Sequence, residues 1–342
     1  MSNNSTKILF FLTLISGVMI TISSNSWLGA WMGLEINLLS FIPIMSKHDN
    51  IFTTEASLKY FLVQALASAI LLFLIISKTM IDEMFSMFNN NLSSMILTTP
   101  LLLKGGAAPF HWWFPSVMEG LSWSNCFILM TIQKIAPLIL ISYSIKTSTF
   151  MMTIIITSIV VGAIGGYNQI SIRKILTYSS INHMGWMLSA MLLGENFWLM
   201  YFLIYSILTL TIISIINPFQ VSFINQTFLM NNDHPIMKFL LFTSLLSLGG
   251  LPPFLGFLPK WIIIQTMVNN GMIFLITIMV VMSLITLYYY LRISYSSFMI
   301  LHSEPSWNIK THKYSHVMST TILLSMTSLL GLIMCTILIS IY

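Results

Sequence analysis

Long apolar stretches separated by short polar connections run through the whole chain of 342 residues. Each stretch has roughly 20 mostly apolar residues, which is the length that an α-helix needs to cross a hydrocarbon core of about 30 Å. The pattern predicts an all-α polytopic membrane protein with about eleven transmembrane helices. The expected ranges are 8–23, 26–45, 55–77, 92–118, 122–143, 150–168, 174–193, 196–217, 236–268, 272–298 and 318–340.

Composition supports the membrane assignment. The chain is 56% hydrophobic and 7% charged, whereas an ordinary soluble domain is about 25% charged. The apolar residues at 8–23 follow Lys7, as in a secretory signal, but no small-residue cleavage site follows them. We therefore expect a first transmembrane helix there, and no separate soluble domain elsewhere.

Basic residues are distributed unevenly between the two sets of alternate loops. The set on the N-terminal side contains Lys7, Lys47, Arg173, Lys174, Lys310 and Lys313. The other set contains Lys78 and Lys146. By the positive-inside rule, we expect the N-terminus on the cytoplasmic or matrix side and the C-terminus on the opposite side.

One interrupted helix recurs later in the chain. GGAAPFHWWFP at 105–115 reappears as GGLPPFLGFLP at 249–259, with Gly-Gly, Pro-Phe and a final Pro in the same order. The two breaks lie in the fourth and ninth predicted helices, five spans apart, so the second copy should be inverted in the membrane. Inverted repeats with interrupted helices point to a transport site near the bilayer midplane. Chance is the alternative, because Gly and Pro interrupt many membrane helices.

Four charged residues fall inside predicted helices or at their breaks: Glu35, Lys104, Lys134 and Lys260. An ionised group in mid-bilayer costs about 2.5 to 3.5 kcal/mol on insertion scales. Interrupted helices can line a wet cavity, in which a lysine could hold or release a proton as a carboxylate moves. A static ion pair between Glu35 and Lys104 is the alternative. Lys134, close to a kink expected at Pro137, could instead snorkel or pair with a neighbouring subunit.

Two histidines are further candidates. His111 lies in the first break, and His183 lies with Ser179, Ser180 and Asn182 in a polar cluster that could hold water or relay protons. A hydrogen-bonded packing role is the alternative for both. The sequence has no metal-ligand spacing, dinucleotide fingerprint or P-loop. We therefore expect no metal, redox cofactor, nucleotide or nucleic acid to be bound by this chain.

Several stretches together resemble the chain 2 family of mitochondrial NADH-ubiquinone oxidoreductase, respiratory complex I. They are WMGLEINLLSF, LLLKGGAAPFHWWFPSVMEGLSW, LTYSSINHMGW and SLGGLPPFLGFLPKW. The resemblance implies two inverted five-helix repeats, at 1–145 and 146–300, with breaks near 104–110 and 249–260. A loop and a C-terminal helix would then occupy 301–342.

The resemblance also implies roles for the buried charges. Glu35 and Lys104 are similar to the charge-switching pair of the family, Lys134 to its central linking lysine, and Lys260 to the residue at the second break. Some related subunits have glutamate at that last position. The family translocates protons as a core subunit of an enzyme that transfers electrons from NADH to ubiquinone.

The implied setting is the mitochondrial inner membrane, with the N-terminus in the matrix and the C-terminus in the intermembrane space. The expected partners are other complex I subunits, especially neighbouring antiporter-like ones, together with phospholipids and protons. NADH, FMN, iron-sulfur clusters and ubiquinone would be held by other subunits. Two other functions stay open: a free-standing cation/proton antiporter, and a membrane spacer with vestigial ion pairs.

Overall fold

The computed structural model describes residues 4–46, 50–84, 90–229, 235–295 and 316–341. In this part of the chain the secondary structure is helical, apart from one isolated bridge between Ser171 and Phe223. The helices are α1 (Asn4–Ser23), α2 (Trp27–Met45), α3 (Ile51–Met84), α4 (Asn90–Gly105), α5 (Trp113–Gly120), α6 (Trp123–Met130), α7 (Ile132–Ser144), α8 (Thr149–Tyr167), α9 (Ile172–Leu193), α10 (Glu195–Phe219), α11 (Ile224–Leu229), α12 (Pro235–Gly249), α13 (Phe257–Asn269), α14 (Ile273–Tyr295) and α15 (His316–Ile341).

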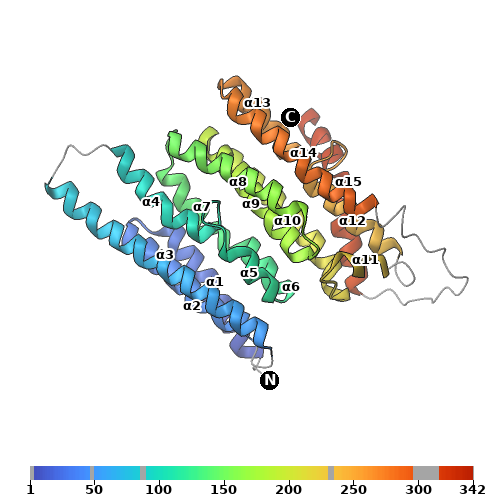
Figure 1. Cartoon of the computed structure of the whole chain (residues 1–342), viewed down its shortest axis with the longest axis horizontal. Coiled ribbons are helices and arrows are strands. Elements are labelled where there is room, and N and C mark those ends of the chain that lie inside the picture. Colours follow the sequence, from blue (N-terminus) through green and yellow to red (C-terminus); the bar gives the residue numbers. More distant parts are fainter. Residues whose placement is uncertain (1–3, 47–49, 85–89, 230–234, 296–315, 342) are drawn as a thin grey trace, which may run out of the picture. The chain divides into compact units, whose positions relative to one another are not determined.

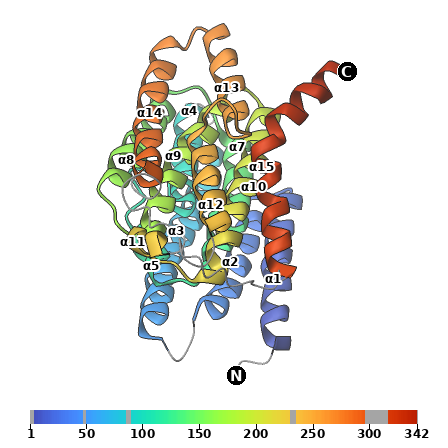
Figure 2. The same cartoon turned by 90° about the vertical axis from the view of Figure 1, so that its right-hand side faces the viewer.

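The chain forms two compact units, residues 1–158 and 159–342, whose boundary lies inside α8. In the first unit, α1 packs along α2, and α3 packs against α2, α4 and α5 (Figure 1). α7 contacts α4 and α1. In the second unit, α10 contacts α9, α12, α13 and α15, and α12 lies beside α15 (Figure 2).

By length and composition, seven stretches of described helix could cross a membrane. They are Ser5–Ser23, Trp27–Met45, Ile51–Met80, Trp123–Ser144, Thr149–Tyr167, Glu195–Phe219 and Ile273–Tyr295. Three shorter helices are also apolar: Met95–Gly105, Met237–Gly249 and Ser319–Leu332. The chain is therefore an all-α polytopic membrane protein, and the number of eleven spans stays a prediction. Lys47, Lys310 and Lys313, used for the orientation, lie outside the described residues.

The two breaks expected from the repeat are present. α4 ends at Gly105 and α5 begins at Trp113, while α12 ends at Gly249 and α13 begins at Phe257. Each Gly-Gly pair has the same use, because the residue after the helix takes a positive φ that favours glycine. These residues are Gly106 at 73° and Gly250 at 84°.

Both helices before the breaks end in a Schellman motif. In the first, the Ala107 amide donates to the Leu102 carbonyl at 3.0 Å, and the Gly106 amide donates to the Leu103 carbonyl at 3.2 Å. The second repeats this pattern, since the Leu251 amide donates to Leu246 at 3.5 Å. The repeated sequence therefore encodes the same helix end twice.

A further interruption lies where one continuous helix was expected at 122–143. α6 ends at Met130, Thr131 has φ −116° and ψ −75°, and α7 begins at Ile132. Pro137, where the kink was expected, lies inside α7. A one-residue interruption of the helix therefore precedes Lys134, and the kink expected at Pro137 stays a prediction.

Small residues allow α1 and α2 to approach each other closely. A Cβ atom added to Gly33 would lie 2.6 Å from Cγ2 and 2.8 Å from the amide nitrogen of Thr21. A Cβ atom added to Gly17 would lie 2.9 Å from the amide nitrogen of Asn37. Close backbone contacts of this kind are typical of helix packing in membranes.

We predict that Gly33→Ala lowers the free energy of unfolding by about 1 to 3 kcal/mol, because the added methyl group overpacks the α1–α2 interface. Gly29→Ala is the matched control, since its Cβ would meet the Ser24 side chain at 3.2 Å and not backbone. Thermal unfolding of the purified chain in detergent measures both. Equal stability of the two variants would contradict the assigned close packing.

Candidate functional site

The first break satisfies its freed carbonyl groups with side chains. The Trp113 indole donates to the Leu103 carbonyl at 3.1 Å, and the Gln64 amide of α3 donates to the Lys104 carbonyl at 3.4 Å. Hydrocarbon offers no water to these groups, so they need donors from the protein. The ammonium group of Lys104 is therefore not needed to cap its own helix.

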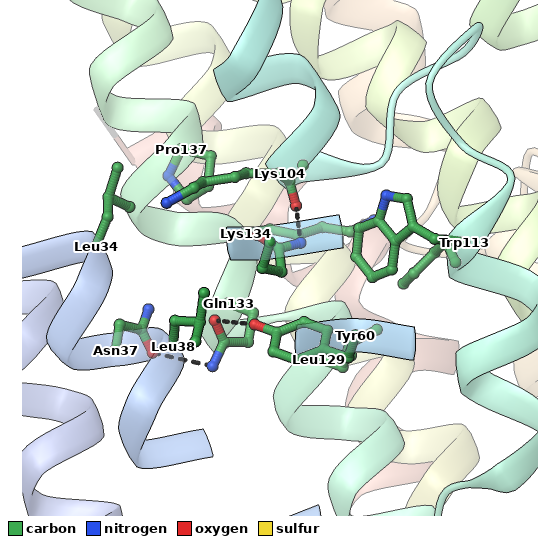
Figure 3. Close-up of a pocket in the computed structure, with 13 residues that line it drawn as sticks. Leu34, Asn37, Leu38, Tyr60, Lys104, Trp113, Leu129, Gln133, Lys134 and Pro137 are labelled. Carbon is green, nitrogen blue, oxygen red and sulfur yellow. Dashed lines mark hydrogen bonds between the residues drawn. The ribbon is translucent and has the colours of Figure 1, made fainter. Parts of the chain in front are cut away.

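Lys104 and Lys134 line one cavity of about 20 Å³ in the first unit (Figure 3). A cavity of this size holds about one water molecule. Both side chains are buried, with 7% and 2% of their surface exposed, and the Lys134 ammonium lies 4.9 Å from the centre of the Phe114 ring. The cavity is lined by Leu34, Asn37, Leu38, Tyr60, Gln64, Lys104, Gly105, Trp113, Phe114, Leu129, Gln133, Lys134 and Pro137.

Glu35 lies on α2 next to the cavity residue Leu34 and interacts electrostatically with Lys104. Its Oε2 atom is buried and has no hydrogen-bond partner among the described residues. The direct salt bridge found in the described part of the chain is elsewhere, between Lys59 and Glu55 at 2.6 Å on the exposed side of α3. Glu35 and Lys104 therefore form no direct salt bridge in this structure.

Neutral polar side chains also line the cavity, and the sequence patterns did not reveal them. The Tyr60 hydroxyl donates to Gln133 at 3.2 Å, and the Gln133 amide donates to Asn37 at 2.9 Å. These residues come from α3, α7 and α2. They are far apart in sequence and match no motif, so the signal that brings them together is tertiary packing.

The second break uses its lysine differently. The Lys260 ammonium, on the first turn of α13, donates to the Gly249 carbonyl at the end of α12 at 2.9 Å. It also lies 5.8 Å from the centre of the Trp186 ring. A positive group at a helix C-terminus is favoured by the helix dipole. Lys260 therefore caps the end of α12 in the second break, as Trp113 and Gln64 cap the end of α4 in the first break.

Lys104 and Lys260, the buried lysines at the two breaks, do not occupy equivalent positions of the repeat. The position matching Lys104 in the second copy is Leu248, and the position matching Lys260 in the first copy is Ser116. Lys104 precedes its break and Lys260 follows its break. The repeat therefore applies to the backbone and not to the charges.

His183 belongs to a buried polar cluster in the second unit. Its Nδ1 atom lies 2.8 Å from the Tyr201 hydroxyl, and its ring centre lies 5.1 Å from that of Tyr205. Tyr205 contacts Ser180, and Ser179 lies on the same helix. The expected serine cluster is thus joined by tyrosines of α10 that the sequence patterns missed.

His111 lies within the first break, with 7% of its surface exposed. Its ring stacks on that of Trp112, with centres 5.1 Å apart. In the same segment, the Thr157 hydroxyl of α8 donates to the Ala108 carbonyl at 3.2 Å. The Nδ1 atom of His111 is buried and has no hydrogen-bond partner among the described residues, so both interpretations of this histidine stay open.

Lys238 was missed because its place near a span end suggested a snorkelling side chain. It lies in the first turn of α12, and 2% of its surface is exposed. Within the described residues, no group of three or more His, Cys, Asp and Glu side chains could hold a metal ion.

Of the residues predicted from the sequence, the structure places Glu35, Lys104 and Lys134 in the first unit and Lys260 and His183 in the second.

Comparisons with known proteins find relatives along nearly the whole chain. Residues 24–286 match the family model described as NADH:quinone oxidoreductase/Mrp antiporter, TM. NADH-ubiquinone oxidoreductase chain 2 of Anopheles gambiae is 52% identical over 97% of this chain and 96% of its own length. The Aedes aegypti protein of the same name is 53% identical over 98% and 97%.

Solved structures share the fold. A chain of respiratory complex I from Thermus thermophilus superposes with a TM-score of 0.80, at 24% identity, over 97% of this chain and 79% of that chain. At this level of identity the likeness concerns the fold alone.

We predict that Lys260→Met lowers the free energy of unfolding by about 1 to 3 kcal/mol, because the buried Gly249 carbonyl loses its side-chain donor. Lys104→Met should lower it less, since Trp113 and Gln64 still cap α4. Thermal unfolding in detergent compares the two variants. An equal or larger loss in Lys104→Met would show that the capping difference is not real.

Proposed function

Because this chain belongs to the NADH:quinone oxidoreductase/Mrp antiporter family and, within it, to the chain 2 group, we propose that it translocates protons as a membrane-arm subunit of respiratory complex I. The enzyme as a whole transfers electrons from NADH to ubiquinone. This chain supplies part of the proton path and none of the redox chemistry.

One observation carries the role of the site. Glu35 is close enough to Lys104 for electrostatic interaction, yet forms no direct salt bridge with it. Lys104 in turn shares a small cavity with Lys134. A small movement of the Glu35 carboxylate would therefore change the free energy of a proton on Lys104 by a large amount, because charges interact strongly in a low-dielectric interior.

The mechanism is a sequence of such charge changes. When Glu35 approaches Lys104, the ammonium form of Lys104 is stabilised, and when it withdraws, the proton is released toward Lys134 through the cavity. Lys260 is the corresponding station of the second unit, and His183 and His111 are further candidates. Each proton moved outward costs about 2.3 kcal/mol per 100 mV, so the stations must not form a continuous open path.

The setting follows from the same proposal. We place the chain as a multi-pass protein of the mitochondrial inner membrane, with the N-terminus in the matrix and the C-terminus in the intermembrane space. Its partners are other complex I subunits, above all neighbouring antiporter-like ones, with phospholipids around them. FMN, iron-sulfur clusters and the sites for NADH and ubiquinone belong to other subunits.

The rival functions predict different behaviour. A free-standing cation/proton antiporter would run apart from NADH dehydrogenase activity when native membrane complexes are separated in mild detergent. A membrane spacer would remain in the complex but would tolerate neutral residues at both Glu35 and Lys104. The absence of a direct pair between these two side chains supports a mobile charge over a helix lock.

We predict that Lys104→Met in the assembled complex lowers the number of protons pumped per NADH oxidised, because Glu35 loses the group whose protonation it controls. Lys59→Met is the matched control, since Lys59 is paired with Glu55 and half exposed. Proton uptake or release by reconstituted vesicles, normalised to NADH oxidation, measures the effect.

An unchanged proton yield in Lys104→Met would contradict the proposed function. If Glu35→Gln combined with Lys104→Met also pumped normally, the spacer would be the better description.

A further inference from the structure

Two hydrogen bonds connect three polar side chains that line the lysine cavity of the first unit into a short hydrogen-bonded chain. The Tyr60 hydroxyl donates to Oε1 of Gln133, and Nε2 of Gln133 donates to Oδ1 of Asn37 (Figure 3). Asn37 and Tyr60 are buried, with 2% and 3% of their surface exposed. The chain thus ties together α2, α3 and α7, the helices that carry or neighbour the buried charges.

These three residues lie on one side of the cavity. α2 ends at Met45 and α3 begins at Ile51, so both helices reach the same end of the unit, here named the α2–α3 end. α6 starts at this end too, since the Asn125 amide donates to the Ile44 carbonyl at 3.1 Å.

The three residues lie on the side of the cavity that faces the α2–α3 end, where Leu38 and Leu129 also line it. Asn37 follows the cavity residue Leu34 toward the end of α2, and Tyr60 precedes Gln64 toward the start of α3. Gln133 precedes Lys134 on the side facing α6. The three polar side chains, with Leu38 and Leu129, therefore form the wall of the cavity on this side.

An apolar layer lies beyond the three hydrogen-bonded residues, and the buried hydroxyl side chains Ser40 and Ser57 lie in the same region. Phe41 and Met45 of α2 and Met130 of α6 are fully buried, each with 0% of its surface exposed. The Phe41 ring meets the Tyr60 ring edge to face, with centres 5.3 Å apart. Water reaching the lysines from the α2–α3 end would have to pass both this apolar layer and the hydrogen-bonded chain.

The chemistry of the three hydrogen-bonded side chains suits a barrier to protons. Primary amides hold two donors and one acceptor, and they do not readily take up a proton while passing one on. The single Tyr60 proton is already used by Gln133. We propose that Tyr60, Gln133 and Asn37 form a closed gate between the Lys104–Lys134 cavity and the aqueous phase at the α2–α3 end.

Two of the three gate residues are close in sequence to charged stations. Asn37 lies two residues after Glu35 on α2, and Gln133, the middle residue of the gate, precedes Lys134 on α7, directly after the interruption at Thr131. A movement of Glu35 or Lys134 would therefore pull on the gate. By this arrangement the gate opens only when the charges shift, so protons enter the cavity in step with the cycle.

The inference rests on the proposed proton translocation and is tested by a leak instead of by pumping. Reconstituted complex carrying Tyr60→Phe, which removes only the hydroxyl, should dissipate an imposed proton gradient without NADH faster than wild type. Losing one neutral hydrogen bond raises the open population by about fivefold, and the leak should rise similarly. Gln133→Leu, which removes both bonds of the gate, should leak more.

Tyr143→Phe is the matched control, because this tyrosine also lies on α7 but is 59% exposed. In this variant the imposed proton gradient should decay at the wild-type rate. Wild-type decay in both gate variants would overturn the gate, and so would equal leaks in all three. If Lys104→Met lowers pumping while the gate variants stay tight, the gate fails and the proposed function stands. If Lys104→Met pumps normally, the proposed function itself fails.

Discussion

Hydrocarbon offers no hydrogen-bond partners, so every backbone group exposed by a broken membrane helix must find one inside the protein. Both breaks in this chain meet that demand. Glycines at positive φ turn each helix end back on its own carbonyls, and side chains from neighbouring helices supply the remaining donors. The buried lysines Lys104 and Lys260 lie next to these two helix ends, one at each break.

The way each carbonyl is capped decides what its lysine can do. Gln64 and Trp113 cap the first break, which leaves the Lys104 ammonium to the cavity and to Glu35. In the second break, Lys260 is itself the cap. Two lysines beside similar sequences therefore differ in freedom: Lys104 can respond to a moving carboxylate, whereas Lys260 must first leave a carbonyl.

Sequence patterns revealed the parts of this arrangement that local rules encode. Apolar length located the helices, Gly-Gly and Pro located the breaks, and charge in an apolar context selected Lys104 and Lys260. The chain of Tyr60, Gln133 and Asn37 could not be found in this way. Its members come from three helices, and an isolated Asn or Gln in a membrane helix has no preferred partner until the helices pack.

Packing also gives meaning to an interruption that the sequence did not predict in the helix at 122–143. Pro137 is the stronger sequence signal for a kink, but the interruption lies at Thr131, directly before Gln133 and Lys134. That position lets both side chains reach the cavity. The burial of Lys238 has the same origin, because proximity to a helix end does not say which neighbours cover the side chain.

The charge-switching mechanism depends on a Glu35 carboxylate that approaches and leaves Lys104. The most direct measurement is electron cryo-microscopy of the complete complex, both at rest and during NADH oxidation, with the distance from the Glu35 carboxylate to the Lys104 ammonium determined in each state. The mechanism predicts a direct salt bridge in one state and its absence in another. The same separation in every state would contradict it.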